Sequence, residues 1–223
     1  MKRKITISKT IFCLVILFSA YSRATSQEKI DDALLNQKIE LHLSKVTLMH
    51  ALGTLSVEHR VPTGIEYSAE DKNEPKLYVE GSSSLKEILD SIVKQEPLYR
   101  WELADGVINL VPIRNRDPFF ESLLNTAISN YDPGKWTIKF QLRDAIGSTP
   151  EVKKLLESKN VELARYRDYA SYPSIYTPKE PPDLRMSNTT VRGILNRIIK
   201  VSEHKSWAIG WRQGEKNVFS IWL

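Results

Sequence analysis

The residue types that could do chemistry in this chain are few, and their spacing does not assemble a catalytic site. The sequence contains no G-x-S-x-G elbow, no phosphate-binding glycine loop and no H-E-x-x-H pair. Its single cysteine, Cys13, lies in an apolar run near the N-terminus, so the rest of the chain has no thiol nucleophile and no disulfide. The serines of "GSSSL" at Gly81 precede a helical pattern, where hydroxyl side chains act as caps. We therefore expect a protein that is not an enzyme.

Metal ligands are equally scattered. A zinc site needs three or four convergent ligands, whereas the four histidines stand apart, at His42, His50, His59 and His204. The acidic residues Glu70, Asp71 and Glu74 alternate with Lys72 and Lys76 and lack the glycine-containing loop of a calcium site. The sequence therefore predicts no metal and no cofactor.

The most unusual segment is "YRDYASYPSIYTPKEPP". It carries Tyr166, Tyr169, Tyr172 and Tyr176, four of the nine tyrosines of the chain, among prolines that oppose regular structure. Tyrosine offers a large contact area with little loss of entropy and a polar tip, so this loop is a candidate binding surface. The alternative is a loop whose tyrosines pack on its own module.

The N-terminus resembles a secretory signal peptide. "MKRKITISK" is basic, "TIFCLVILFSAY" is apolar but short for a membrane span, and "SRA" ends in a small residue. We expect cleavage near Ala24 and a periplasmic or secreted product without a membrane span, although an uncleaved anchor is the alternative. Residues 1–24 hold five basic and no acidic residues, so of 32 basic and 27 acidic residues the mature chain keeps 27 of each. Such a neutral balance does not favour nucleic acid as a partner.

Hydrophobic periodicity gives the order β-α-β-β-α-β-β for residues 38–112. "KIELHL" and "LYVEG" alternate as strands, Leu48–Leu55 and Leu85–Val93 have helical spacing, and "LYRWEL" and "VINLVP" flank an Asp-Gly hairpin turn. In the second half, residues 117–131 are predicted as one helix and residues 136–142 as a strand. A helix near Ser148, a short strand "VEL", a strand "LRMS", a helix from Thr189 and two final strands follow.

Two helices share one pattern. "SLKEILDSIVK" begins at Ser84 and "TVRGILNRIIK" begins 106 positions later, at Thr190. An aromatic strand, a glycine turn and an alternating last strand follow each of them, which indicates an internal repeat. We predict an α+β fold of two small β-α-β-β-α-β-β modules, with helices packed on small mixed sheets.

The first module resembles the secretin and TonB short N-terminal domain (STN). The resemblance rests on Leu48, Ala51, Leu52 and Leu55 in the first helix, Val79 and Gly81 in a V-x-G strand, Leu85, Glu87, Leu89 and Asp90 in the second helix, and the closing hairpin Tyr99 to Pro112. It covers residues 38–112, about a third of the chain. The second half departs from the pattern, with Gly193 in place of an acidic residue. The resemblance implies a periplasmic module that acts by protein–protein contact through sheet edges and helix faces.

The predicted organisation is a signal peptide (1–24), a linker (25–37), the first module (38–112), a connecting helix and turn (113–135), and a second module (136–223) with a tyrosine- and proline-rich insertion at 164–183. We expect a non-catalytic adaptor or accessory that binds a protein partner in the cell envelope. Two alternatives stay open. One is an enzyme acting on cell-wall or glycan substrates with carboxylates in a groove between the modules. The other is a structural protein whose halves bury each other's sheet edges.

Overall fold

The first half folds in the order that its hydrophobic pattern predicts. The computed structural model describes residues 31–68, 74, 76–134, 139–164, 183–201, 205–212 and 216–223. In the first half these form β1 (Lys38–Val46), α2 (Leu48–Val57), β2 (Thr63–Glu66), β3 (Leu77–Ser84), α3 (Leu85–Gln95), β4 (Tyr99–Ala104) and β5 (Val107–Pro112). The hydroxyl of Ser84 caps α3 in a reciprocal capping box with Glu87. Asp105 and Gly106 both have positive φ, as the tight hairpin between β4 and β5 requires.

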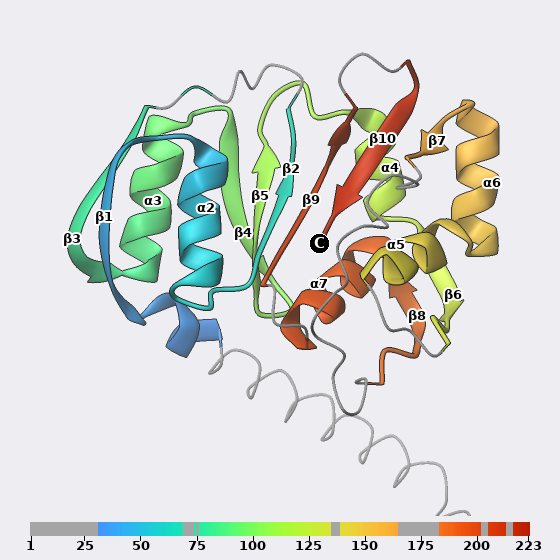
Figure 1. The fold of residues 1–223 in the computed structure, drawn as a ribbon, viewed down its shortest axis with the longest axis horizontal. Helices are drawn as coiled ribbons and strands as arrows, with labels where there is room; N and C mark the ends of the chain where they lie inside the picture. The colour runs from blue at the N-terminus through green and yellow to red at the C-terminus, as the bar shows by residue number, and fades with distance from the viewer. Residues whose placement is uncertain are drawn as a thin grey trace, which may run out of the picture.

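The second half differs more from the sequence-based expectation. It contains α4 (Pro118–Leu124), β6 (Ala127–Tyr131), α5 (Lys139–Gly147), α6 (Pro150–Lys159), β7 (Glu162–Leu163), β8 (Met186–Thr190), α7 (Val191–Val201), β9 (Ser206–Trp211) and β10 (Val218–Trp222). The fold is α+β, as expected, with helices packed against a mixed sheet (Figure 1).

Two predicted elements are wrong. Residues 117–131 are not one helix, because α4 ends at Leu124 and residues 127–131 pair with β8 as a strand. Residues 136–142 are not one strand, because α5 begins at Lys139. Leu142 and Ile146 lie one helical turn apart and are both buried, so packing of a helix face decides the conformation of this segment. Residues 135–138 lie outside the described part of the chain.

Both halves contribute to one sheet. Its six strands have the order β4-β5-β2-β9-β10-β7, and two separate strand pairs, β1-β3 and β6-β8, lie outside it. The pairings of the two halves correspond: β4-β5 and β9-β10 are antiparallel, β2-β5 and β7-β10 are parallel, and β1-β3 and β6-β8 are antiparallel. The halves meet where β2 runs parallel to β9.

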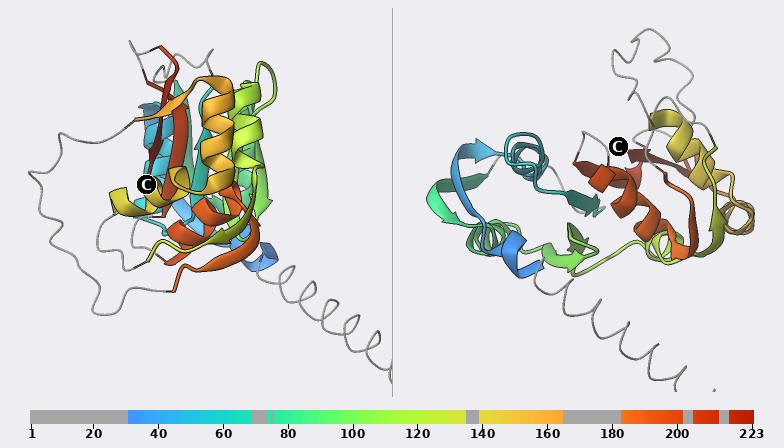
Figure 2. Two further views of the ribbon diagram at one scale, coloured as in Figure 1. Left: turned by 90° about the vertical axis from the view of Figure 1, so that its right-hand side faces the viewer. Right: turned by 90° about the horizontal axis from the view of Figure 1, so that it is seen from below.

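The second half has the strand order of the first with every direction reversed. Since β2 is parallel to both β5 and β9, strand β9 runs opposite to β4, its counterpart in the order. The helices also change face. α2 and α3 pack with Ile108 and Leu110 of β5, whereas α7 packs with Val107 of β5 and Ile209 of β9. The strand arrangement of the second half is therefore obtained from that of the first by two steps. The first is a rotation of 180° about an axis that lies in the sheet and is perpendicular to the strands. The second is a translation along this axis. Figure 2 shows the first half and the second half side by side.

Candidate functional site

The interface between the halves, where β2 pairs with β9, is called the joint below, and a glycine and a tryptophan lie at its centre. Gly64 of β2 lies opposite Trp207 of β9, and the parallel pairing extends from Thr63 to Glu66. A Cβ on Gly64 would lie 2.2 Å from Cε2 of Trp207, so only glycine allows the indole ring to lie on the backbone of β2. The indole is 2% exposed, and its Nε1 donates to Oδ1 of Asn196 in α7 at 2.9 Å.

A buried carboxylate closes the same joint. Glu66, two residues after Gly64, is 1% exposed. Its carboxylate accepts from Nε of Arg116 at 2.7 Å and from Nη2 of Arg116 at 2.9 Å, and it also binds Arg192 of α7. The Arg192 guanidinium in addition lies 5.8 Å from the centre of the Trp207 ring. Two cations thus compensate the buried negative charge.

Helix α7 also binds the hairpin of the first half. Nδ2 of Asn196 donates to the carbonyl of Ala104 at 3.3 Å, and Nζ of Lys200 donates to the carbonyl of Asp105 at 2.7 Å. Three residues of α7, one turn apart in succession, therefore hold the first half: Arg192, Asn196 and Lys200. With Trp207 and Ile209 of β9 they form a five-residue docking surface.

The first half contains the counterparts of all five residues. Subtracting 106 positions from Arg192, Asn196, Lys200, Trp207 and Ile209 gives Lys86, Asp90, Lys94, Trp101 and Leu103. The geometry agrees with this spacing, because Nε1 of Trp101 donates to Oδ1 of Asp90 at 2.9 Å, as Trp207 does to Asn196. We call Lys86, Asp90, Lys94, Trp101 and Leu103 the α3–β4 surface.

The electrostatics of the α3–β4 surface centre on Asp90. Nζ of Lys86 donates to its Oδ2 at 2.9 Å, one helical turn away. The hydrogen bonds from Lys86 and, to a smaller extent, from Trp101 hold the pKa of Asp90 below its ordinary range. The carboxylate is therefore ionised at neutral pH and orients the indole of Trp101.

Strand β4 ends the six-stranded sheet, with β5 as its one strand partner among the described residues. Ala104 and Val107 flank the two-residue turn and form a hydrogen-bonded pair, so alternate residues Glu102 and Arg100 also bond to β5. The N–H and C=O groups of Trp101 and Leu103 consequently point to the outer edge. In β9 the corresponding groups face β2: the carbonyl of Ile209, for example, accepts from the N–H of Tyr67 at 2.9 Å. The side chains of Trp101 and Leu103 are half-buried.

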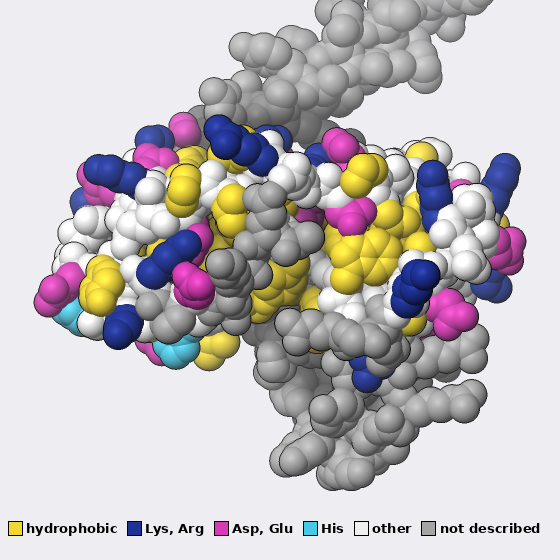
Figure 3. Space-filling model, turned by 90° about the horizontal axis from the view of Figure 1, so that it is seen from above, with side chains coloured by type: hydrophobic (Ala, Val, Ile, Leu, Met, Phe, Trp, Pro, Cys, Tyr) yellow, Lys and Arg dark blue, Asp and Glu magenta, His cyan; other side chains and the backbone are white. Residues whose placement is uncertain are grey.

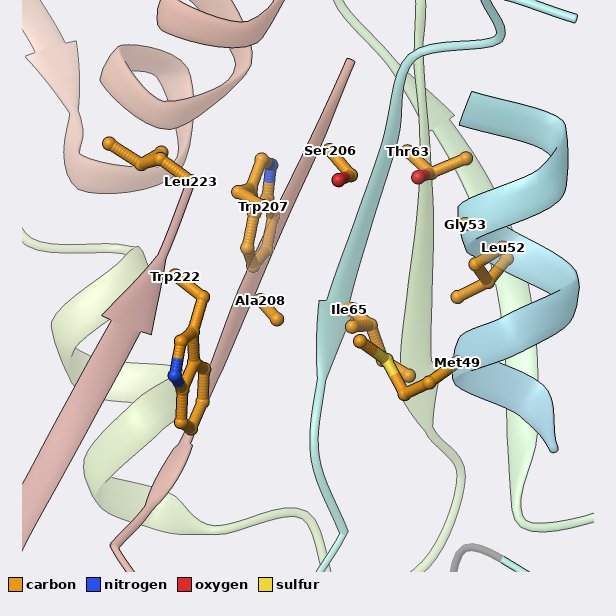
Figure 4. A pocket seen from close by; sticks show the side chains of 10 residues that line it. All are labelled: Met49, Leu52, Gly53, Thr63, Ile65, Ser206, Trp207, Ala208, Trp222 and Leu223. Carbon is orange, nitrogen blue, oxygen red and sulfur yellow. The ribbon is translucent and has the colours of Figure 1, made fainter. Parts of the chain in front are cut away.

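A pocket of about 130 Å³ lies on the other side of the joint, between α2 and the strands β2, β9 and β10 (Figure 4). The hydroxyl oxygens of Thr63 and Ser206 lie at one end of it, and Met49 and Trp222 lie toward the other. Its lining contains apolar and hydroxyl side chains and no Asp or Glu among the described residues. The predicted alternative of two carboxylates in a groove between the modules gains no support from this pocket.

Trp211 of β9 packs among aromatic rings of the second half. Trp211 stacks on Phe119 with ring centres 5.2 Å apart, and both rings contact Phe219. Nε1 of Trp211 donates to the carboxylate of Asp117, the N-cap of α4. Seen from above, hydrophobic side chains gather in the right-hand half of the molecule, where β10 and α4 lie (Figure 3). Trp136 lies outside the described residues.

Tyr166, Tyr169, Tyr172 and Tyr176 all lie in the segment 165–182, outside the described residues. His42 and His50 are exposed on separate elements, and among the described residues no group of His, Cys, Asp and Glu could hold a metal ion. Sequence reasoning missed the α3–β4 surface, although the 106-residue spacing of Trp101 and Trp207 was a signal that could have found it.

No known protein family, no curated protein and no solved structure matches the chain. The resemblance of residues 38–112 to the secretin and TonB short N-terminal domain therefore stays a prediction. None of the helices in the described ranges is long and apolar enough to cross a membrane.

Proposed function

We propose that this protein is an exported cell-envelope protein that acts without catalysis, by holding a partner protein on its α3–β4 surface. A strand of the partner would extend the six-stranded sheet beyond β4, and part of the partner would lie over α3. The leader-like residues 1–24 support export to the periplasm or the cell exterior.

The observation that carries the proposal is the use of the equivalent surface inside the chain. Trp207 and Ile209 pair with β2, Arg192 binds the buried Glu66, and Asn196 and Lys200 bind the carbonyls of Ala104 and Asp105, so these five residues hold the first half of the protein. Their counterparts on α3 and β4 have the same spacing and the same Trp–side-chain hydrogen bond, but lie at the end of the sheet. The α7–β9 surface of the second half binds strand β2, and the equivalent α3–β4 surface of the first half lies at the end of the sheet, where a partner strand could pair with it.

Replacing one outward-facing N–H tests this proposal. Leu103→Pro removes the donor at the outer edge of β4 and keeps the hydrogen bonds to β5, because an edge strand tolerates proline where its N–H faces solvent. Leu103→Thr is the matched control, since it changes the side chain and keeps the donor. Both variants are first checked for wild-type circular dichroism and a cooperative thermal transition.

The readout is cross-linking of the purified protein in an envelope extract of the source organism. The expected result is a cross-linked complex that forms with the wild type and Leu103→Thr and is lost with Leu103→Pro. A complex that forms equally well with a folded Leu103→Pro variant would show that the β4 edge is not the contact surface, and so would the absence of any complex with the wild type.

A further inference from the structure

The pairing of β2 with β9 indicates what kind of strand the α3–β4 surface would bind. Strand β2 enters it with the sequence Thr63-Gly64-Ile65-Glu66, running parallel to β9. Gly64 is obligatory because the indole of Trp207 occupies the space of its missing side chain, with Cζ2 and Nε1 each 2.5 Å from the position of a Cβ. Glu66 lies opposite Ile209 and brings its carboxylate to Arg192.

The α3–β4 surface has a counterpart for each residue of α7 and β9 that contacts Gly64, Glu66 and the backbone of β2. Trp101 has the position in β4 that Trp207 has in β9, and its indole is held by the equivalent hydrogen bond, to Asp90. Lys86 stands where Arg192 stands, one turn before Asp90, and its side chain is 57% exposed. The outward N–H and C=O groups of Trp101 and Leu103 supply the backbone hydrogen bonds.

We propose that the partner contributes a strand that runs parallel to β4, with a glycine opposite Trp101 and an acidic residue two positions later, opposite Leu103, that binds Lys86. This inference rests on the proposed function and adds the direction, register and sequence of the bound strand. A larger residue in place of the glycine collides with the indole, and a basic residue in place of the acid meets Lys86 with like charge.

The glycine contributes more to this selection than the acid does. Lys86 already pairs with Asp90 at 2.9 Å, so an incoming carboxylate shares this cation, and a lysine lacks the two-pronged geometry with which an arginine binds a carboxylate. Arg116, the second cation at Glu66, precedes α4 and has no counterpart 106 positions earlier in the first module. We therefore expect discrimination mainly at the position opposite Trp101.

A folded second copy of this chain does not offer such a strand among its described residues, because its Gly64 and Glu66 lie in β2, which is already paired with β5 on one side and β9 on the other. Strand β7 occupies in the second half the place of β2 in the first, beside the last strand and parallel to it. It spans only Glu162–Leu163, and the chain continues with Ala164 and Arg165, so the glycine and the following acid are both missing. The partner is accordingly a different protein.

The test uses the chain's own β2 sequence as the probe. A fluorescein-labelled peptide VPTGIEYS, copied from residues 61–68, is titrated with the purified protein and followed by fluorescence polarisation. Two altered peptides carry valine in place of the glycine and lysine in place of the glutamate. The protein variants are Lys86→Glu, its matched control Lys153→Glu on the exposed face of α6, and Leu103→Pro.

We expect the unaltered peptide to bind, the valine peptide to bind at least about tenfold more weakly, equivalent to about 1.4 kcal/mol, and the lysine peptide to bind a fewfold more weakly. Lys86→Glu should reverse the preference between the glutamate and lysine peptides, whereas Lys153→Glu should leave it unchanged. A spin label at the N-terminus of the peptide should broaden the amide signal of Tyr99 and spare that of Ala104, because parallel strands begin at the same end.

The outcomes separate the two proposals. If all three peptides bind equally and Leu103→Pro abolishes them all, the β4 edge remains the contact surface and the glycine–acid rule is overturned. If the spin label broadens Ala104 instead of Tyr99, the proposed direction is wrong. If no peptide binds while the envelope complex still depends on the N–H of Leu103, the inference about the strand fails and the proposed function stands.

Discussion

Substitution by alanine should destabilise this protein at Gly64 and stabilise it at Gly53. Gly64→Ala places a Cβ 2.2 Å from Cε2 of Trp207, whereas a Cβ on Gly53 in α2 meets no atom within 4 Å. Ordinary carbon contacts are about 3.5 Å or longer, so Gly64→Ala must displace the indole or β2 by about 1 Å. Gly53→Ala only gains the higher helix propensity of alanine.

The magnitude follows from what holds the indole in place. Trp207 is 2% exposed and donates to Asn196 at 2.9 Å, so it cannot move aside without losing both packing and a buried hydrogen bond. Overpacking costs about 1–3 kcal/mol, and an unpaired buried polar group costs about 1–3 kcal/mol. We expect Gly64→Ala to lower the free energy of unfolding by about 2–5 kcal/mol and Gly53→Ala to raise it by about 0.5–1 kcal/mol.

Thermal and urea unfolding of the two variants measures this difference. For a protein of this size each kcal/mol shifts Tm by about 2–4 °C, so Gly64→Ala should melt about 6–12 °C below the wild type if the loss is about 3 kcal/mol. Hydrogen exchange locates the effect: the N–H of Tyr67, which donates to Ile209 at 2.9 Å, should lose protection in Gly64→Ala only. A Gly64→Ala protein as stable as the wild type would refute the close packing of the joint.

Two further predictions concern charged groups. Glu66→Gln should lower the free energy of unfolding by about 3 kcal/mol, because it leaves Arg116 and Arg192 without their shared carboxylate inside the joint, and urea unfolding with Arg185→Gln, an exposed arginine, as control measures the loss. The indole N–H signal of Trp101 should shift as pH falls through the lowered pKa of Asp90, while that of Trp207 should not, because Asn196 does not titrate. Since the pKa of Asp90 is lowered in the folded protein, its contacts contribute stability above the unfolded pKa and lose it as pH falls through the folded one; a Trp207 signal that titrates alongside would contradict this assignment.

The elements of the first half could be predicted because each carries its own local signal. Alternating Ile39, Leu41 and Leu43 are all buried in β1, and the Asp105-Gly106 turn forms the expected hairpin. The error at residues 127–131 has a different origin, since this strand forms by pairing with β8, about 60 residues away in the chain. Its sequence, AISNY, gives no strong helix or strand pattern alone.

The arrangement around the joint could be predicted only in part. The matching helices at Ser84 and Thr190 point to equivalent positions, and the same spacing connects Trp101 with Trp207 and Asp90 with Asn196. No periodicity indicates that β2 pairs with β9, or that Glu66 meets Arg192, 126 residues away. The strand pairing and the ion pair both depend on the tertiary fold, and the local sequence around each residue contains no signal for them.

The pairing of β2 with β9 has a consequence for how the protein is made. Strand β2 comprises residues Thr63–Glu66, but its partner β9, Ser206–Trp211, is synthesised much later. Contacts between such distant segments form late and slowly because the intervening loop must first be closed. Until then the edge of β2, with Gly64 and the acid Glu66, is open to any surface that fits it. During folding, the first half is thus itself a ligand of the kind that the finished protein is proposed to bind, and a chain that closes this pairing slowly is exposed to capture by the α3–β4 surface of a folded molecule.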